Sequence, residues 1–158
     1  MYELQSDNAR SPSSHRLKPM TRVLHREISQ DDDGIHCYKG EPFTGVSYSA
    51  DPAGRVTSEC EFQGGLRSGV GRAWHRNGQL AEESHFYRDV IHGTSREWDD
   101  AGRLISELCC EYGITQSERR WDHNGVLTED YRLQEGDDDY KLLQEYRRAY
   151  APRDGESP

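Results

Sequence analysis

Apolar and polar positions alternate along the middle of the chain in short segments that glycine-containing turns separate. In one of these segments Gly69 begins a stretch that ends at Trp74, Asn77-Gly78 follows, and a second stretch begins at Leu80. Alternation with a period of two is typical of β-strands, and Asn-Gly between two such stretches is a strong hairpin signal. The pattern therefore predicts a β-hairpin.

The hairpin pattern recurs at a nearly constant spacing. Trp98 follows Trp74 by 24 positions, and Trp121 follows Trp98 by 23. Glycines recur with the same period, and we interpret them as structural: Gly45, Gly54, Gly69, Gly78, Gly93, Gly102 and Gly125. A fixed period of this length indicates one small supersecondary unit stacked several times. We therefore predict an all-β fold, an elongated antiparallel sheet of about four consecutive β-hairpin repeats of 23–24 residues with a short C-terminal helix.

The repeats divide the chain into four parts. We predict a disordered N-terminal segment at 1–20, a hairpin-repeat domain at 21–136, a C-terminal capping helix at 137–150 and a disordered tail at 151–158. The N-terminal segment lacks periodicity and is rich in Ser, Asn, Arg and Pro. The stretch from Arg22 to Ile28 alternates loosely, which favours an edge strand. In the helix Leu143, Tyr146 and Tyr150 would share one face and close the open end of the stack.

Two hairpin registers fit these repeats. A two-residue turn would place Arg72 opposite Glu83, Arg96 opposite Glu107, and Arg119 opposite Asp130. A three-residue turn, with Gly78 in the left-handed conformation, would instead place Trp74 opposite Leu80. Exposed ion pairs contribute about 0–1 kcal/mol, whereas burial of a large apolar side chain contributes roughly 1.5–3 kcal/mol. We favour the three-residue register, with Trp, Leu and Phe on one face, while the repeated charge pairs keep the other register open.

Composition and charge narrow the classes of partner. Only 32% of the 158 residues are apolar and 31% are charged, which fits a single sheet better than a thick globular core. The formal net charge of −9 argues against nucleic acid or an anionic membrane as a partner and favours a basic protein. No run approaches the roughly 18 apolar residues of a membrane span, and no hydrophobic signal core is visible, so we expect a cytoplasmic protein.

The candidate chemistry is sparse. Cys109 and Cys110 are adjacent, so they would point to opposite faces of a strand and are badly placed to bind one metal ion together. Acids recur once per repeat at Glu59, Glu83, Glu107 and Asp130, but equivalent positions supply similar environments, whereas catalytic acid pairs need different ones. Neither a nucleophile elbow nor a phosphate-binding glycine loop occurs. We expect no enzymatic activity, no catalytic residue, no cofactor and no metal.

The repeat also carries a resemblance. The stretch 41–45, Glu-Pro-Phe-Thr-Gly, followed by units of the form Gly…Arg-x-Trp…Asn-Gly-x-Leu…Glu, resembles the variant MORN-repeat proteins of the YwqK antitoxin type. The resemblance covers about 38–131. It implies a sheet of consecutive hairpins and neutralisation of a toxin, as an antitoxin or an immunity protein. The chain departs from the family pattern at Ala50, where the other units have Trp, and at Gln116, where they have Gly.

The expected binding residues are the arginine and tryptophan two positions apart in each of three repeats: Arg72, Trp74, Arg96, Trp98, Arg119 and Trp121. Each pair shares a sheet face in either register, and Trp and Arg are enriched in interface hot spots. The alternative is that the tryptophans only pack the sheet against its own neighbours. We therefore expect a non-enzymatic binding protein that neutralises a toxin, for which the acidic charge favours a basic partner, by direct contact; a structural scaffold or a self-associating MORN-type protein is the alternative.

Overall fold

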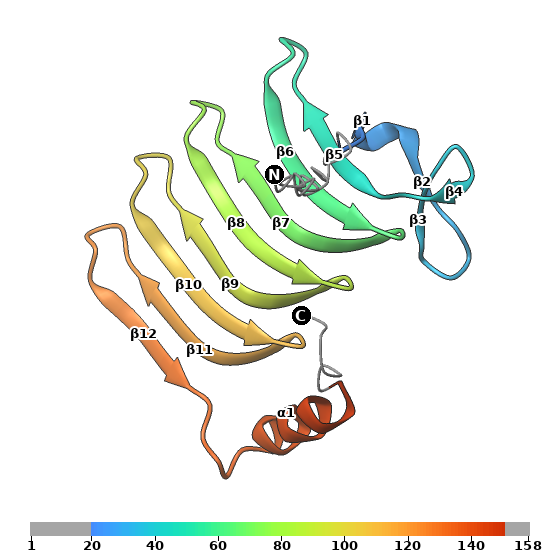
Figure 1. Cartoon of the computed structure of the whole chain (residues 1–158). Coiled ribbons are helices and arrows are strands. Elements are labelled where there is room, and N and C mark those ends of the chain that lie inside the picture. The colour runs from blue at the N-terminus through green and yellow to red at the C-terminus, as the bar shows by residue number, and fades with distance from the viewer. Residues whose placement is uncertain (1–19, 151–158) are drawn as a thin grey trace, which may run out of the picture.

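The computed structural model describes residues 20–150, and a long β-sheet dominates this part of the chain (Figure 1). Nine strands form the sheet in the order β1-β5-β6-β7-β8-β9-β10-β11-β12. Their bounds are β1 Arg22–Leu24, β5 Gly45–Ala50, β6 Val56–Gln63, β7 Leu66–Trp74, β8 Leu80–Tyr87, β9 Val90–Trp98, β10 Leu104–Glu111, β11 Ile114–Trp121 and β12 Leu127–Arg132. From β5 onward each strand pairs with the next along the chain, so the predicted sheet of consecutive hairpins is confirmed.

Four hairpins turn on the same side of the sheet in the same way. In the turn after β7, the N–H of Gly78 donates to the carbonyl of His75 and the N–H of His75 donates to the carbonyl of Gln79, both at 2.8 Å. Gly78 has a φ of +88°, a conformation that costs glycine little and other residues about 1–2 kcal/mol. Trp74 consequently lies opposite Leu80, as the three-residue register predicted.

Beyond an unpaired residue in β8, the hairpin follows the register that a two-residue turn predicted. Trp74 pairs with Leu80, but Ala73 pairs with Glu82 and Arg72 with Glu83, so the residue between Leu80 and Glu82 has no partner on β7. Such a β-bulge shifts the register by one residue. The same shift occurs in β6, β10 and β12, where the unpaired residues are Thr57, Ile105 and Thr128. The two registers that the sequence presented as alternatives therefore coexist in every hairpin.

The bulge also corrects the expected distribution of aromatic side chains. Gly71, Ser84 and Phe86 share one face, and a Cβ built on Gly71 would lie 2.8 Å from the Phe86 ring. Arg72 and Trp74 lie on the opposite face because side chains alternate along β7. The prediction that Trp, Leu and Phe share one face is therefore wrong for Phe86, since one extra residue reverses the alternation beyond it.

The N-terminal end of the sheet is not antiparallel. The predicted edge strand from Arg22 to Ile28 is shorter than expected: β1 ends at Leu24 and pairs with β5 in parallel, and a 3-10 helix (His25–Glu27) follows. A separate three-stranded sheet comes next, made of β2 (Ile28–Gln30), β3 (His36–Tyr38) and β4 (Glu41–Pro42). Val23, Phe43 and Phe62 form a buried cluster between these elements. This end of the sheet therefore holds a small core, while Cys110, Ile114 and Leu143 are buried near the other end.

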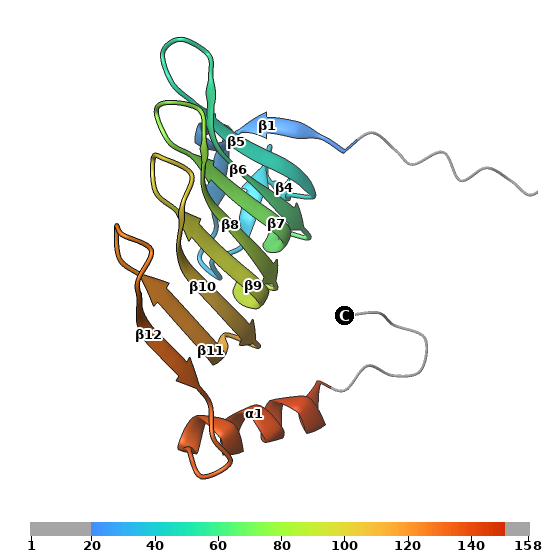
Figure 2. The ribbon, with the colours of Figure 1, turned by 90° about the vertical axis from the view of Figure 1, so that its left-hand side faces the viewer.

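One α-helix, α1 (Asp138–Ala149), occurs in residues 20–150 and follows the last hairpin (Figure 2). Leu143 is its buried residue, and the ring of Tyr146 lies edge-on to that of Tyr112 in the β10–β11 turn. The helix was expected to close the open end of the stack; instead it lies beside this turn, and all six residues of β12 are exposed. Residues 1–19 and 151–158, expected to be disordered, lie outside the described residues. Within 20–150 no helix is long and apolar enough to cross a membrane.

Candidate functional site

The six predicted binding residues lie on one face of the sheet. Arg72 and Trp74 are two positions apart on β7 with no bulge between them, and the same spacing holds on β9 and β11. Side chains two positions apart in a strand point to the same side. We call Trp74, Trp98 and Trp121 the Trp row; all three are half-buried.

The arginines belong to a row of alternating charge that crosses the sheet. We call it the charge ladder; its members are Glu59, Arg72, Glu83, Arg96, Glu107, Arg119 and Asp130, each opposite the next. Within a hairpin the ion pairs are close, with Nε of Arg72 and of Arg96 each 2.8 Å from a carboxylate oxygen. Between hairpins the distance from Arg72 to Glu59 is 3.8 Å. The ladder holds the arginines in fixed positions beside the Trp row.

The tryptophans line grooves between successive hairpin turns. A cavity borders each of two tryptophans: Trp74 with Pro52 and Arg55 of the preceding turn, and Trp98 with Leu80 and Gly102. The cavity volume is 420 Å³ at Trp74 and 400 Å³ at Trp98. The two grooves share two equivalent positions of the repeat: the tryptophan, and the residue at the end of the preceding turn, which is Arg55 in one groove and Gln79 in the other.

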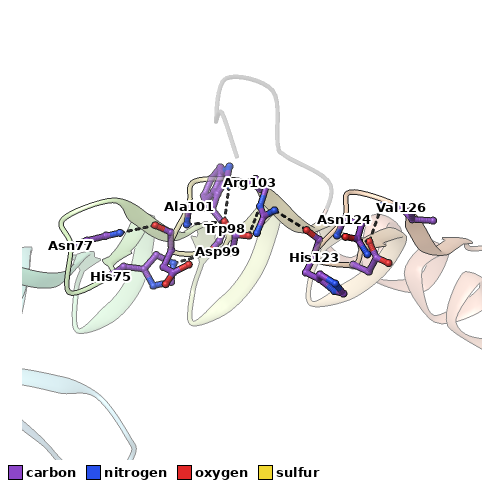
Figure 3. Close-up of polar contacts among 11 residues, drawn as sticks. His75, Asn77, Trp98, Asp99, Ala101, Arg103, His123, Asn124 and Val126 are labelled. Atoms are coloured by element: carbon purple, nitrogen blue, oxygen red, sulfur yellow. Dashed lines mark hydrogen bonds and ion pairs between the residues drawn. The ribbon is translucent and has the colours of Figure 1, made fainter.

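Side-chain hydrogen bonds join neighbouring turns (Figure 3). These bonds fix the spacing between the turns that border the grooves. Nε2 of His75 donates to the backbone carbonyl of Trp98 at 2.7 Å. Nδ2 of Asn77 donates to the carbonyl of Asp100 at 2.6 Å. Both bonds lead from the second turn to the third, one of them directly to a residue of the Trp row.

Arginines make the equivalent connection elsewhere. The guanidinium of Arg103 donates to the carbonyl of His123 at 2.7 Å, from the third turn to the fourth (Figure 3). Arg55 reaches the carbonyl of Arg76 at 3.5 Å, from the first turn to the second. The four turns therefore form one connected edge along the sheet.

Aspartate organises three of the four turns from within. Oδ1 of Asp99 accepts the N–H groups of Ala101 and Arg103 at 3.0 and 2.9 Å. These backbone hydrogen bonds hold the pKa of Asp99 below its usual value, and the pKa values of Asp51 and Asp122 are lowered in the same way. The second turn has His75 at the equivalent position, which leaves its side chain free to reach Trp98.

Sequence reasoning missed these turn residues, although a signal was present. Asp51, His75, Asp99 and Asp122 recur with the repeat spacing of 24, 24 and 23. An aspartate at the start of a turn commonly accepts N–H groups two residues on. The side-chain bonds between turns had no such signal, because they depend on how closely the hairpins approach.

The repeat glycines have positive φ angles throughout: Gly45, Gly54, Gly69, Gly78, Gly93, Gly102 and Gly125. The constraint differs between them. A Cβ on Gly78 would meet open space, whereas a Cβ on Gly45 would lie 2.1 Å from the carbonyl oxygen of Thr21. Glycine is thus required at position 78 for the backbone conformation of the turn. At position 45 it is also required because the chain before β1 approaches too closely for a side chain.

Two further cavities lie away from the Trp row. One of 390 Å³ separates the small sheet from β5 and β6, and there Nδ1 of His25 lies 3.0 Å from Oγ of Ser47. The other, of 330 Å³, is lined by tyrosines beside α1, among them Tyr112 and Tyr146. Among residues 20–150 no three His, Cys, Asp or Glu side chains are grouped so as to hold a metal ion.

No family model and no curated protein matches the sequence. Among solved structures, the chain is similar to a crystal structure of TarM, with 14% identity over 68% of this chain and a TM-score of 0.37. A mutant of S. aureus TarM in complex with Fondaparinux, alpha-GlcNAc-glycerol and UDP gives 13% identity over 67% and a TM-score of 0.35. The chain spans 20% and 19% of the length of these two proteins.

Proposed function

We propose that this chain is a cytoplasmic, non-enzymatic protein-binding repeat protein, an antitoxin or immunity protein that neutralises a toxin by direct contact. The observation that carries the proposal is the Trp row, with half-buried tryptophans at equivalent positions of successive hairpins beside fixed arginines. Trp and Arg are, with Tyr, the residues enriched among interface hot spots. Stacked repeats commonly present such extended surfaces to a protein partner.

The geometry of the grooves supports a protein ligand. Each groove is open, bordered by a tryptophan and by polar turn residues such as Arg55 and Gln79. An apolar side chain of a partner would bury against the indole, and its neighbours would contact the polar rim, which is the usual anatomy of a protein interface. Hydrogen bonds between the turns fix the spacing in advance, which lowers the entropic cost of binding.

The charge supports a basic toxin. The net charge of −9 accelerates encounter with a positively charged partner at low salt. The resemblance to antitoxins of the YwqK type points to the same class of partner. Enzymatic activity has no support of this kind, since the equivalent carboxylates Glu83 and Glu107 are each occupied by an arginine at 2.8 Å.

The test is binding to the product of the neighbouring gene, measured by calorimetry, together with rescue of growth when that product is expressed. We expect a complex, and we expect Trp98→Ala to weaken it at least about tenfold. Tyr87→Ala is the matched control, since Tyr87 is an exposed aromatic outside the Trp row. Thermal unfolding of both variants separates loss of binding from loss of fold.

Two outcomes would overturn the proposal. The first is the absence of any complex and of any rescue with intact protein. The second is a complex that tolerates Trp74→Ala, Trp98→Ala and Arg96→Ala as well as it tolerates Tyr87→Ala, which would move the binding surface off the Trp row.

A further inference from the structure

The last strand leaves one edge of the long sheet open. β12 pairs with β11 on one side, no described element pairs with its other side, and all six of its residues are exposed (Figure 1). An open edge presents N–H and C=O groups that can pair with another strand. This edge does not depend on the proposed toxin binding, although β12 is the strand next to β11, which carries Trp121 of the Trp row.

The register identifies which backbone groups face outward. The N–H of Leu133 donates to the carbonyl of Gln116 on β11 at 2.9 Å. Because hydrogen-bonded and non-hydrogen-bonded pairs alternate in an antiparallel ladder, Tyr131 also faces β11, while Asp130 and Arg132 direct their N–H and C=O groups away from it. The open edge therefore offers two residues of opposite charge for pairing.

Both charges lack a partner within residues 20–150. Asp130 takes the ladder position that Glu83 and Glu107 take in the preceding hairpins, yet no ion pair joins it to Arg119, which instead lies 3.8 Å from Glu107. Aspartate is one methylene shorter than glutamate. Arg132 makes no ion pair either, among the residues described. The ladder thus ends in an unpaired acid and an unpaired base, on one face and two positions apart.

We propose that the β12 edge is an interface between two copies of this chain, related by a two-fold axis at Tyr131. Antiparallel pairing of β12 with β12 of the second copy in this register sets Asp130 opposite Arg132 and Arg132 opposite Asp130. In this register Asp130 and Arg132, whose N–H and C=O groups face outward, form hydrogen-bonded pairs across the axis, as an antiparallel ladder requires. The neighbouring registers set Asp130 opposite Asp130, or Arg132 opposite Arg132, and like charges directly opposite destabilise a pair.

Other contacts along the edge fit the same register. The two Tyr131 side chains, each 37% exposed in a single chain, would lie opposite each other at the axis in a non-hydrogen-bonded pair, where side chains approach most closely. Glu129 would lie opposite Leu133, so no like charges meet. The amide of Gln134 donates to the carbonyl of Arg132 at 2.9 Å in the single chain, and the second copy displaces it.

Sedimentation equilibrium over a wide concentration range tests the proposal without any partner protein. We expect a reversible dimer, with the dissociation constant raised at least about tenfold by Asp130→Arg or by Arg132→Asp alone, because each sets like charges opposite. The double variant Asp130→Arg/Arg132→Asp restores the complementarity and is expected to return the dissociation constant to within about threefold of the original. Arg132→Ala and Arg132→Pro remove the same charge, but only the proline also removes an outward-facing backbone N–H. Arg132→Pro is therefore expected to weaken the dimer more than Arg132→Ala.

Cross-linking fixes the register. In a Cys109→Ser background, Tyr131→Cys is expected to form a disulfide-linked dimer, because Cα atoms of non-hydrogen-bonded partners lie about 4.5 Å apart, within disulfide reach. Glu129→Cys is the control and is expected to form no disulfide between the two copies, since the two copies of residue 129 would lie four positions out of register.

A monomer at all concentrations would overturn the proposal. So would a dimer that is indifferent to Arg132→Pro, a double reversal no better than either single reversal, or cross-linking through Glu129→Cys. None of these outcomes bears on toxin binding, which the Trp row variants test separately.

Discussion

Nε of Arg72 donates a hydrogen bond of 2.8 Å to a carboxylate oxygen of Glu83 on the neighbouring strand. The two side chains are 37% and 24% exposed, so solvent screens their attraction. In a double-mutant cycle with Arg72→Ala and Glu83→Ala, we expect a coupling of about 0.2–1 kcal/mol in the free energy of unfolding, smaller at high salt. Urea denaturation measures it.

Arg26 and Glu83 form the control cycle, because Arg26 lies in the 3-10 helix and, among residues 20–150, forms no ion pair with a ladder residue. Distant sites are expected to be additive. If the cycle between Arg72 and Glu83 were equally additive, the ladder would be a solvated charged surface without structural effect.

Two repeat glycines are expected to differ in their tolerance of alanine. Gly78→Ala places a Cβ in open space at a φ of +88°, so only the backbone conformation is penalised, by about 1–2 kcal/mol. Gly45→Ala adds a clash, because its Cβ would lie 2.1 Å from the carbonyl oxygen of Thr21. We expect Gly45→Ala to be the more destabilising in thermal unfolding; an equal loss would mean that β1 moves aside freely.

The hairpins and the positions of their turns were predictable from the sequence, because the residues that recur with the repeat are ones with strict conformational preferences. A glycine such as Gly78 marks the left-handed position of a turn, and Trp74 marks the strand end before it. The common face of Arg72 and Trp74 follows from their spacing alone. These features are local, so no knowledge of packing was needed.

The bulge at Ala81 and the contacts between turns were not predictable in the same way. An unpaired residue has no periodic signature, yet it decides the face on which Phe86 lies. The bond from His75 to Trp98 depends on the distance between two hairpins, which the strand twist sets. The parallel pairing of β1 was hidden too, because three residues are too few for a pattern.

The turn aspartates are expected to make the fold sensitive to acid. The folded-state pKa of Asp99 lies below its ordinary value, chiefly because its carboxylate accepts the N–H of Arg103. A depressed pKa contributes stability above the unfolded-state value of about 3.9, and this contribution is lost as the pH falls through the folded-state pKa. We expect Asp99→Asn to flatten the decline in stability between about pH 5 and pH 2, as followed by urea denaturation.

Asp100→Asn is the matched control for that experiment. It removes the same charge from the neighbouring residue, whose carboxylate accepts none of the hydrogen bonds within the described turn. An acid profile that Asp99→Asn and Asp100→Asn change equally would assign the effect to net charge rather than to the turn.

The cysteines are expected to react in an order that the sheet determines. Cys109 is exposed and the adjacent Cys110 is buried. Burial raises the pKa of Cys60 to about 11 and also raises the pKa of Cys110. Since the thiolate is the reactive form, iodoacetamide at about pH 8 should modify Cys109 first, as mass spectrometry of peptides would show. Cys109→Ser should abolish the fast phase, and rapid modification of Cys60 would reveal opening of the N-terminal core.

The attachment of α1 depends on one buried leucine. Leu143 is 1% exposed, whereas Leu142 beside it is 38% exposed. Leu143→Ala removes a buried side chain and leaves a cavity, so we expect a loss of about 2–5 kcal/mol in the free energy of the step that detaches or unfolds the helix. Leu142→Ala changes the same residue type at the next position and is expected to cost much less. Hydrogen exchange of the α1 amides measures both, because exchange accelerates where a segment opens locally. Equal protection of the helix in the two variants would show that Leu143 does not hold it in place, and would leave that role to the other contacts of α1, which include the salt bridge from Arg147 to Glu111 and the ring contact of Tyr146 with Tyr112.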